Sequence, residues 1–323
     1  MKIAVLGAGA IGSLFASLLT EDGAEVILLT RTEEQAEYIS ENGVKVTDRE
    51  GSRIVKIPTR SSRSFSGAAD LILIAVKSYD TRTAVKNIAD QLGEDTCVLT
   101  LQNGLGNIEM LIDILGRERV LAGTTAQAST LIKIGNILHA ADGPTVIGEL
   151  HGGLSKRATE ISSLFNSCGI STKLTDNLCG AVWMKVLVNA GINPLSALMG
   201  LTNGELIELP EVREVMVQAV REGEAVARRL RIGLGGLDPV EKMLQTARKT
   251  YRNRSSMLQD VLRGKRTEVD SINGTLVDIG RRLGVYTPVN EWLTRSVKDI
   301  PMIRSSDRGF HREILVRLLQ SSR

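Results

Sequence analysis

Three polar residues repeat along one stripe of an apolar segment, WMKVLVNAGINP at 183–194. Lys185, Asn189 and Asn193 stand at i, i+4 and i+8, which places them on one face of a helix. Each such group costs about 1–3 kcal/mol or more when it is buried without a partner. A helix with one solvated face is one reading; we favour a stripe that faces a ligand, because the other residues are apolar. Pro194 should end or bend the helix at Asn193, so that the strict stripe holds only for Lys185 and Asn189.

The N-terminal segment has the pattern of a dinucleotide-binding turn. IAVLG at 3–7 is typical of a strand buried on both faces of a parallel sheet, and a helical pattern follows it. Gly7, Gly9 and Gly12 have the spacing that allows a tight turn, a close approach of backbone to a pyrophosphate, and close packing of helix on strand. The helix N-terminus then offers N–H groups to phosphate. We predict a dinucleotide site formed by Gly7, Ala8, Gly9, Ala10, Ile11 and Gly12.

Three further polar residues lie at the ends of strand-like segments. Arg31 follows EVILLT at 25–30, Lys77 closes LILIAVK at 71–77, and Asn103 follows CVLTLQ at 97–102. The carboxyl ends of parallel strands share one edge of the sheet, so these residues should line one cleft. Arg31 stands where an NAD site would carry an acid. An arginine there can pair with a 2′-phosphate, which predicts NADPH; the alternative is an ordinary surface arginine.

The composition describes an ordinary soluble protein. The 323 residues suit two domains, and 40 Lys and Arg against 37 Asp and Glu is too even a balance to indicate nucleic acid or a membrane surface. Three cysteines without CxxC spacing, and the lack of a signal or membrane-spanning pattern, predict a reducing, cytoplasmic location. The N-x-S/T matches at Asn253 and Asn273 are then chance occurrences. We expect no metal site.

A change of pattern near residue 175 divides the chain. We expect an α/β Rossmann-type domain at 1–175, with antiparallel strands over 119–150 extending its sheet, and an all-α domain at 176–323. Long helices are expected over 210–231 and 238–253. Gly264 predicts a break or bend in the segment that follows. Spacing alone makes Glu268, just beyond that glycine, an exposed partner of Lys265 or Arg266.

Six motifs spread along the chain carry a resemblance to a known family: GAGAIG at 7–12, VKSYDT at 76–81, QNGLGN at 102–107, WMKVLVNAGINPLSAL at 183–198, NGEL at 203–206 and SSMLQDVLRGKRTEVDSING at 255–274. They resemble those of the 2-dehydropantoate 2-reductases, also called ketopantoate reductases. The resemblance covers the whole chain. It implies an N-terminal Rossmann domain followed by an all-helical domain like that of 6-phosphogluconate dehydrogenases.

Carried over position by position, the resemblance implies that Lys185 is the catalytic lysine, which gives a proton to the substrate carbonyl oxygen. It implies that Glu268 holds the substrate hydroxyl and assists the lysine, which reverses the exposed role that spacing alone favoured. The implied substrate-binding residues are Asn103, Asn189, Asn193, Asn203 and Ser256. Asn103 also marks the junction with the cofactor, while Arg31 and Lys77 match contacts to the adenosine phosphate end of NADPH. Asp80 is given no cofactor role, because some members carry glutamine there.

The function implied by the resemblance is NADPH-dependent reduction of 2-dehydropantoate to (R)-pantoate in pantothenate and coenzyme A biosynthesis. Two alternatives stay open: a reductase of another branched 2-keto acid, and a non-catalytic NADPH-binding sensor. The expected partner is the small-molecule substrate, without nucleic acid or membrane, and the chain acts alone or as a homodimer. Burial would lower the pKa of Lys185 and Glu268 would oppose that shift; the sequence leaves the balance open.

Overall fold

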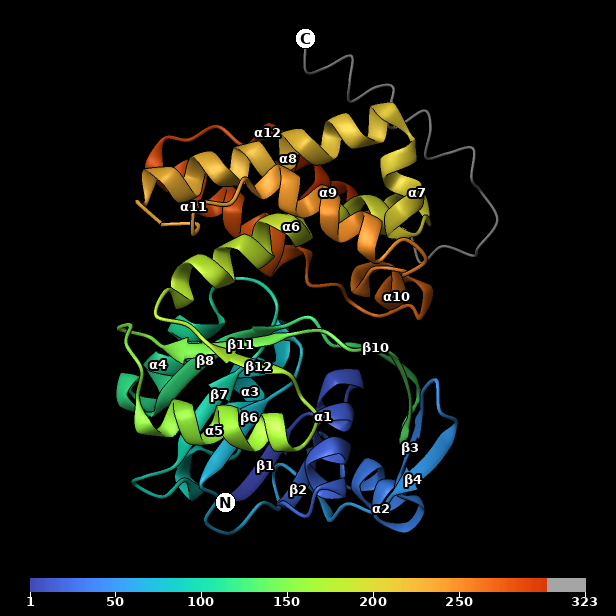
Figure 1. Ribbon diagram of the computed structural model, residues 1–323, viewed down its shortest axis with the longest axis vertical. Coiled ribbons are helices and arrows are strands. Elements are labelled where there is room, and N and C mark those ends of the chain that lie inside the picture. The colour runs from blue at the N-terminus through green and yellow to red at the C-terminus, as the bar shows by residue number, and fades with distance from the viewer. Residues whose placement is uncertain (301–323) are drawn as a thin grey trace. The chain divides into compact units, whose positions relative to one another are not determined.

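The computed structural model describes residues 1–300, and the contacts within the chain divide it into two compact units (Figure 1). The first unit comprises Met1–Gln102 and Gly106–Leu178. The second comprises Asn103–Leu105 and, of the described residues, 179–300. The division therefore falls at Leu178, whereas the sequence pattern changes near residue 175. The last part of the expected helical domain, 301–323, lies outside the described residues.

The first unit is built on an eight-stranded sheet with the order β12-β11-β8-β7-β6-β1-β2-β5. Every neighbouring pair from β5 to β8 is parallel, β11 runs antiparallel to β8, and β12 is parallel to β11. The central strands are buried on both faces, as their unbroken apolar runs require. The strands are β1 (Lys2–Leu6), β2 (Glu25–Thr30), β5 (Thr59–Ser61), β6 (Leu71–Ile74), β7 (Cys97–Thr100), β8 (Val120–Thr125), β11 (Thr145–Glu149) and β12 (Thr172–Leu174).

Helices cover both faces of this sheet. One apolar cluster joins alternate residues of β1 to α1 and α5, and a second joins the intervening residues to α3 and α4. In the first cluster the rings of Phe15 and Phe165 meet edge to face at 5.6 Å between centroids. The helices are α1 (Ala10–Glu21), α2 (Glu33–Asn42), α3 (Thr81–Lys86), α4 (Asn107–Leu115) and α5 (Lys156–Ser167). Alternating strands and helices make this a Rossmann-type α/β unit, as expected.

A second sheet of four strands, in the order β4-β3-β10-β9, belongs to the same unit. Its strands are β3 (Val44–Thr47), β4 (Ser52–Val55), β9 (Ala128–Lys133) and β10 (Asn136–Ala141). The expectation that all of 119–150 would extend the main sheet is wrong for β9 and β10. Strand β8 already pairs with β7 on one side and β11 on the other, so the intervening hairpin has no edge to join there. It pairs with β3 instead.

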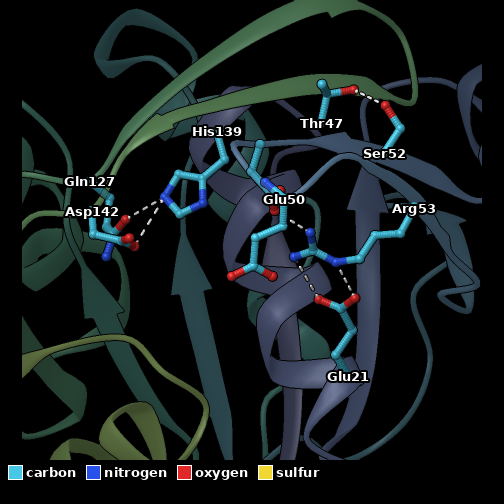
Figure 2. Close-up of polar contacts among 9 residues, drawn as sticks. Glu21, Thr47, Glu50, Ser52, Arg53, Gln127, His139 and Asp142 are labelled. Carbon is cyan, nitrogen blue, oxygen red and sulfur yellow. Dashed lines mark hydrogen bonds and ion pairs between the residues drawn. The ribbon is translucent and has the colours of Figure 1, made fainter.

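Side-chain contacts of two residues, Arg53 and His139, brace this small sheet and the segment leading into it (Figure 2). Arg53 of β4 donates from Nε to Glu21 at 2.5 Å and from a second nitrogen at 3.1 Å, and also pairs with Asp48. Because Glu21 is the last residue of α1, this contact fixes the far end of the helix that begins at the glycine-rich turn. His139 of β10 lies 2.9 Å from Gln127 and 3.4 Å from Asp142.

The second unit is helical and has one apolar core. A π-helical turn, Asp270–Gly274, leads into α11. The helices are α6 (Leu178–Met199), α7 (Asn203–Glu208), α8 (Pro210–Arg229), α9 (Pro239–Lys249), α10 (Ser256–Leu262), α11 (Thr275–Leu283) and α12 (Pro288–Lys298). Helix α6 has the length and apolar character of a membrane span, but 78% of its most apolar window is buried inside the protein. It is the core helix of this unit.

Two expectations about helix breaks meet different outcomes. The predicted break at Gly264 is present: α10 ends at Leu262, and Gly264 has a φ of +62°, which favours glycine. The expected end of α6 at Asn193 is wrong, since the helix runs through Pro194 to Met199. Pro194 has no N–H for the carbonyl of Ala190 four residues earlier. The side-chain Nδ2 of Asn273 donates to that carbonyl at 3.0 Å in its place.

Candidate active site

The glycine-rich turn has the shape of a phosphate cradle. Gly7 has a φ of +119°, and a Cβ there would lie 2.8 Å from the nitrogen of Val76. A Cβ on Gly12 would lie 1.9 Å from the carbonyl oxygen of Gly7, so these two glycines are required by packing. Gly9 differs, because the nearest atom to its Cβ position is 4.0 Å away. Gly9 caps α1 without a side-chain hydrogen bond. Together, the open space and the N–H groups of a 12-residue helix fit a pyrophosphate.

The loops after β6 and β7 are tied together beside this cradle. Gln102 donates from Nε2 to the carbonyl of Val76 and to the hydroxyl of Thr81, both at 2.8 Å. Thr81 in turn lies 3.4 Å from Oδ1 of Asn107 at the start of α4. Val76, which Gly7 touches, directly precedes Lys77. Lys77 is half-buried on the loop that follows the carboxyl end of β6, where the sequence placed it.

Arg31 lies in an exposed turn at the carboxyl end of β2. Thr30 holds the turn by donating to the carbonyl of Thr32 at 2.8 Å. The nearby carboxylate of Glu33 accepts hydrogen bonds from Ser61, at 2.5 Å, and from Ser64. These hydroxyls, Ser61 first, lower the pKa of Glu33. The acid next to this strand end is thus engaged by serines of the β5 loop, while the Arg31 side chain extends into solvent.

Lys185 lies in α6, and both of its helix neighbours, Met184 and Val186, are buried. Burial lowers the pKa of Lys185 to about 8, and the charge of Glu268 partly opposes this shift. Glu268 is only 6% exposed. The exposed position that spacing alone favoured for Glu268 is therefore wrong. The sequence left open which effect is larger; in the structure, burial lowers the pKa of Lys185 more than Glu268 raises it.

The polar stripe of α6 holds for all three residues. Because the helix continues past Asn193, Lys185, Asn189 and Asn193 share one face of a single helix. Lys185 and Asn189 are partly exposed, and Asn193 is 6% exposed. The expectation that Asn193 marks a helix end is wrong, because Asn273 supplies the hydrogen-bond donor that Pro194 lacks and α6 continues to Met199.

Asn203 and Ser256 begin two other helices of the same unit. Asn203 is the first residue of α7 and donates from Nδ2 to the hydroxyl of Thr250 at 2.8 Å. Its Oδ1 is buried and meets no donor within residues 1–300. Ser256 is the first residue of α10, but the cap is made by Ser255, which accepts from the N–H of Leu258 at 3.1 Å. The hydroxyl of Ser256 is not needed to cap the helix.

Asn103 belongs to the helical unit, although it follows β7 in sequence. The N–H of Leu105 donates to the carbonyl of Ser271 at 2.8 Å. Gly104 makes the close approach possible, because its φ is +88° and a Cβ there would lie 2.5 Å from the same carbonyl. Ser271 donates from its backbone and its hydroxyl to the carbonyl of Glu268. The structure therefore brings the loop of Asn103 to the turn that carries Glu268.

Two residues in this framework were missed by the sequence reasoning. Gln102 stands in the QNG motif, yet only Asn103 was singled out there. The sequence gives Asn273 only as a chance N-x-T match, which its burial fits, and assigns no role to its hydrogen bond with α6. A usable signal was present for Asn273, since it lies between Ile272 and Leu276, which follow the helical period of the core.

A dinucleotide cradle on an α/β sheet, joined in one chain to a helical unit that carries a lysine of lowered pKa and a buried glutamate, defines a class of nicotinamide-dependent reductase. Comparisons with known proteins name the family. Residues 3–152 match the family model described as ketopantoate reductase PanE/ApbA, and residues 177–300 match its C-terminal counterpart. The chain belongs to the ketopantoate reductase family. It is an oxidoreductase with a nicotinamide cofactor.

Named relatives and solved structures agree with this assignment. The 2-dehydropantoate 2-reductase of Pyrococcus horikoshii is 37% identical over 92% of this chain and 97% of its own length. That of Halobacterium salinarum is 36% identical over 92% and 98%. A PanE/ApbA family ketopantoate reductase from Ralstonia eutropha JMP134 superposes with a TM-score of 0.84 at 33% identity, covering 92% and 97%. A D-mandelate dehydrogenase with NADH and anilino(oxo)acetate superposes with a TM-score of 0.87 at 25% identity, covering 98% and 100%.

The cradle predicts different outcomes for two alanine substitutions. Gly9→Ala should keep the melting temperature of the wild type but weaken NADPH binding at least about tenfold, because its methyl group fills the space for the pyrophosphate. Gly12→Ala should lower both, since its methyl group collides with Gly7. Fluorescence titration with NADPH and thermal unfolding by circular dichroism measure the two effects. Wild-type affinity in Gly9→Ala would contradict the assignment of the cradle.

Proposed function

We propose that this protein reduces 2-dehydropantoate to (R)-pantoate with NADPH, and so serves pantothenate and coenzyme A biosynthesis. The observation that carries the proposal is Lys185, an amine whose pKa burial lowers to about 8, in the same unit as the buried Glu268. A group with a pKa near the working pH is suited to proton transfer. Relatives that bear the name of this activity span nearly the whole chain.

The proposed chemistry assigns one task to each residue. A bound nicotinamide supplies hydride to the carbonyl carbon of the substrate. The ammonium of Lys185 stabilises the charge that develops on the carbonyl oxygen and donates its proton there. Glu268 accepts from the substrate hydroxyl and favours the charged form of the lysine. The amides at Asn103, Asn189, Asn193 and Asn203 and the hydroxyl of Ser256 bind and orient the substrate, with Ser256 on the carboxylate.

The cofactor is proposed to be held by the first unit. The cradle from Gly7 to Gly12 takes the pyrophosphate, and Arg31 and Lys77 take the adenosine phosphate end. Arg31 supports NADPH over NADH, because an exposed guanidinium can bind a 2′-phosphate in bidentate fashion. The engagement of Glu33 with Ser61 and Ser64 supports the same choice, since this carboxylate is not presented to a ribose.

A second candidate is reduction of a different branched 2-keto acid. It is favoured by the close superposition on D-mandelate dehydrogenase. The same lysine chemistry would serve any 2-keto acid, and the side-chain pocket decides among them. A non-catalytic NADPH sensor on the same fold is a third reading, and retention of Lys185, Glu268 and the asparagines argues against it.

The setting of the protein is proposed to be the cytoplasm, without a membrane and as a monomer or a homodimer. Cys97 and Cys168 are buried and Cys179 is exposed, and none of the three is in a disulfide within the described residues. Burial raises the pKa of Cys97 to about 12, so this thiol is unreactive. Thiols of this kind suit a reducing compartment.

A substrate comparison tests the proposed function directly. Purified protein should oxidise NADPH with 2-dehydropantoate at a kcat/KM at least about tenfold above that with 2-ketoisovalerate or benzoylformate, a difference of about 1.4 kcal/mol. Absorbance at the nicotinamide band measures each rate. Faster turnover with one of the other keto acids would transfer the function to the second candidate. No turnover with any of them, together with tight NADPH binding, would favour the sensor.

The role of Lys185 predicts a pH dependence. The ammonium is the acid, so kcat/KM should be highest below the pKa of about 8 and fall about tenfold per pH unit above it. Glu268→Gln removes the charge that raises this pKa, so its decline should begin at lower pH. Lys185→Met should lose turnover while NADPH still binds. A profile that stays flat to pH 10 would exclude Lys185 as the proton donor.

The role of Arg31 predicts a change in cofactor preference. Arg31→Ala should weaken NADPH binding at least about tenfold and change NADH binding little, because only NADPH carries the 2′-phosphate. Arg49 is an exposed arginine of the same unit, and Arg49→Ala is the matched control. Calorimetric titration with each cofactor measures the affinities. Equal losses for both cofactors would reject the role.

A further inference from the structure

Helix α6 contains a defect in its hydrogen bonding that another element repairs. The carbonyl of Ala190 would normally accept from the N–H of residue 194, but proline has none. A buried carbonyl without a donor costs about as much as a lost hydrogen bond. Asn273 donates from Nδ2 to the Ala190 oxygen at 3.0 Å. The helix is continuous from Leu178 to Met199 across this point.

The amide of Asn273 is held in one orientation by its neighbours. Nδ2 also donates to Oδ1 of Asn290 at 3.0 Å, so both of its protons are used. Asn290 cannot turn around, because its own Nδ2 donates to the carbonyl of Ala219 at 2.9 Å and to Glu222 at 2.7 Å. A reversed Asn273 would aim its oxygen at two acceptors. The donor direction toward Ala190 therefore follows from the network.

Asn290, which accepts from Asn273, is itself anchored by a partly exposed carboxylate. Glu222 of α8 accepts from the N–H groups of Val289 and Asn290 in the first turn of α12, at 2.8 and 2.9 Å. A carboxylate at a helix N-terminus is a favourable placement. The chain of bonds runs from α8 through α12 to Asn273 and ends on α6. It spans four elements that are distant in sequence.

The two ends of this chain carry the residues of the proposed chemistry. Ala190 directly follows Asn189 and lies five residues after Lys185 in α6. Asn273 belongs to the π-helical turn Asp270–Gly274, and the N–H groups of Ser271 and Ile272 in this turn donate to the carbonyl of Glu268. π-Helical turns are often found at functional sites. The bond from Asn273 to Ala190 is thus a direct link between the element of Lys185 and the element of Glu268.

We propose that Asn273 is a positioning residue that fixes the register of the Lys185 helix against the Glu268 turn by bonding to the carbonyl that Pro194 leaves open. The inference rests on the proposed roles of Lys185 and Glu268. Asn273 itself is fully buried and acts through Ala190. Its Oδ1 meets no donor within residues 1–300. The amide therefore acts only through its Nδ2 donor, although the unpaired acceptor is unfavourable.

A double-mutant cycle tests the link. Asn273→Ala should lower kcat by about 10-fold or more, toward the roughly 100-fold that a misplacement of about 1 Å costs, with a much smaller change in KM. Pro194→Ala restores an N–H for the Ala190 carbonyl. In the Pro194→Ala background, Asn273→Ala should therefore reduce kcat at least about threefold less than in the wild type, since the helix then supplies its own donor.

A control separates positioning from general destabilisation. Val226 is fully buried in the core of the same unit and has an apolar side chain. Val226→Ala should lower the melting temperature, as Asn273→Ala does, but keep kcat within about twofold of the wild type. If Asn273→Ala folds poorly, the melting temperatures of the same cycle give the answer: its loss should shrink when Pro194→Ala is present.

Two results would overturn the inference. The first is a kcat for Asn273→Ala within about twofold of the wild type. The second is an equal loss in the two backgrounds, in kcat for folded variants or in melting temperature otherwise, which would show that Asn273 does not act through the Ala190 carbonyl. Failure of the proposed function has a different signature, because it appears in the wild-type protein itself, as turnover of 2-dehydropantoate that is absent or slower than that of another 2-keto acid.

Discussion

The helical unit depends on the placement of one amine in an apolar helix. Burial disfavours the charged form of Lys185 and lowers its pKa to about 8, and Glu268 limits that shift. A lysine whose pKa is lowered in this way needs rigid surroundings, because greater exposure to solvent would return its pKa to the ordinary value. The surrounding apolar core and the continuity of α6 supply that rigidity. The hydrogen bond from Asn273 keeps the helix intact where Pro194 would otherwise weaken it.

In the first unit, the feature that matters is the open space beside the glycine-rich turn. Gly7 and Gly12 are required because a methyl group would collide with backbone, whereas Gly9 has open space around its Cβ position. The three glycines of one motif thus serve different physical needs. The loops beside them are fixed by Gln102, which joins the segment before Lys77 to the start of α3. The N–H groups at the start of a helix can bind a phosphate without a charged side chain, which is the role proposed for this turn.

Membership of the family and the choice of substrate rest on different parts of the molecule. Carbonyl reduction needs a hydride donor, an acid and an opposing charge, and these needs are the same for every 2-keto acid. The close superposition on a D-mandelate dehydrogenase fits this view. Discrimination between keto acids depends on the volume and polarity around the side chain, where one methylene is worth only about 1–3 kcal/mol.

The sequence by itself determined the Rossmann-type unit, the helical unit and the cofactor class, because strand runs, glycine spacing and helical periods are local signals. It failed where distant residues meet. The hairpin β9–β10 does not join the main sheet, because β8 is already paired with β7 on one edge and β11 on the other. Spacing placed Glu268 in solvent, while packing buries it. Pro194 indicated a helix end, but a donor 79 residues later in the chain removed the reason for one. Sequence rules consider only residues that are close in the chain. These three outcomes depend on strand pairing, packing and hydrogen bonding with residues far away in the chain, which only the tertiary structure brings together.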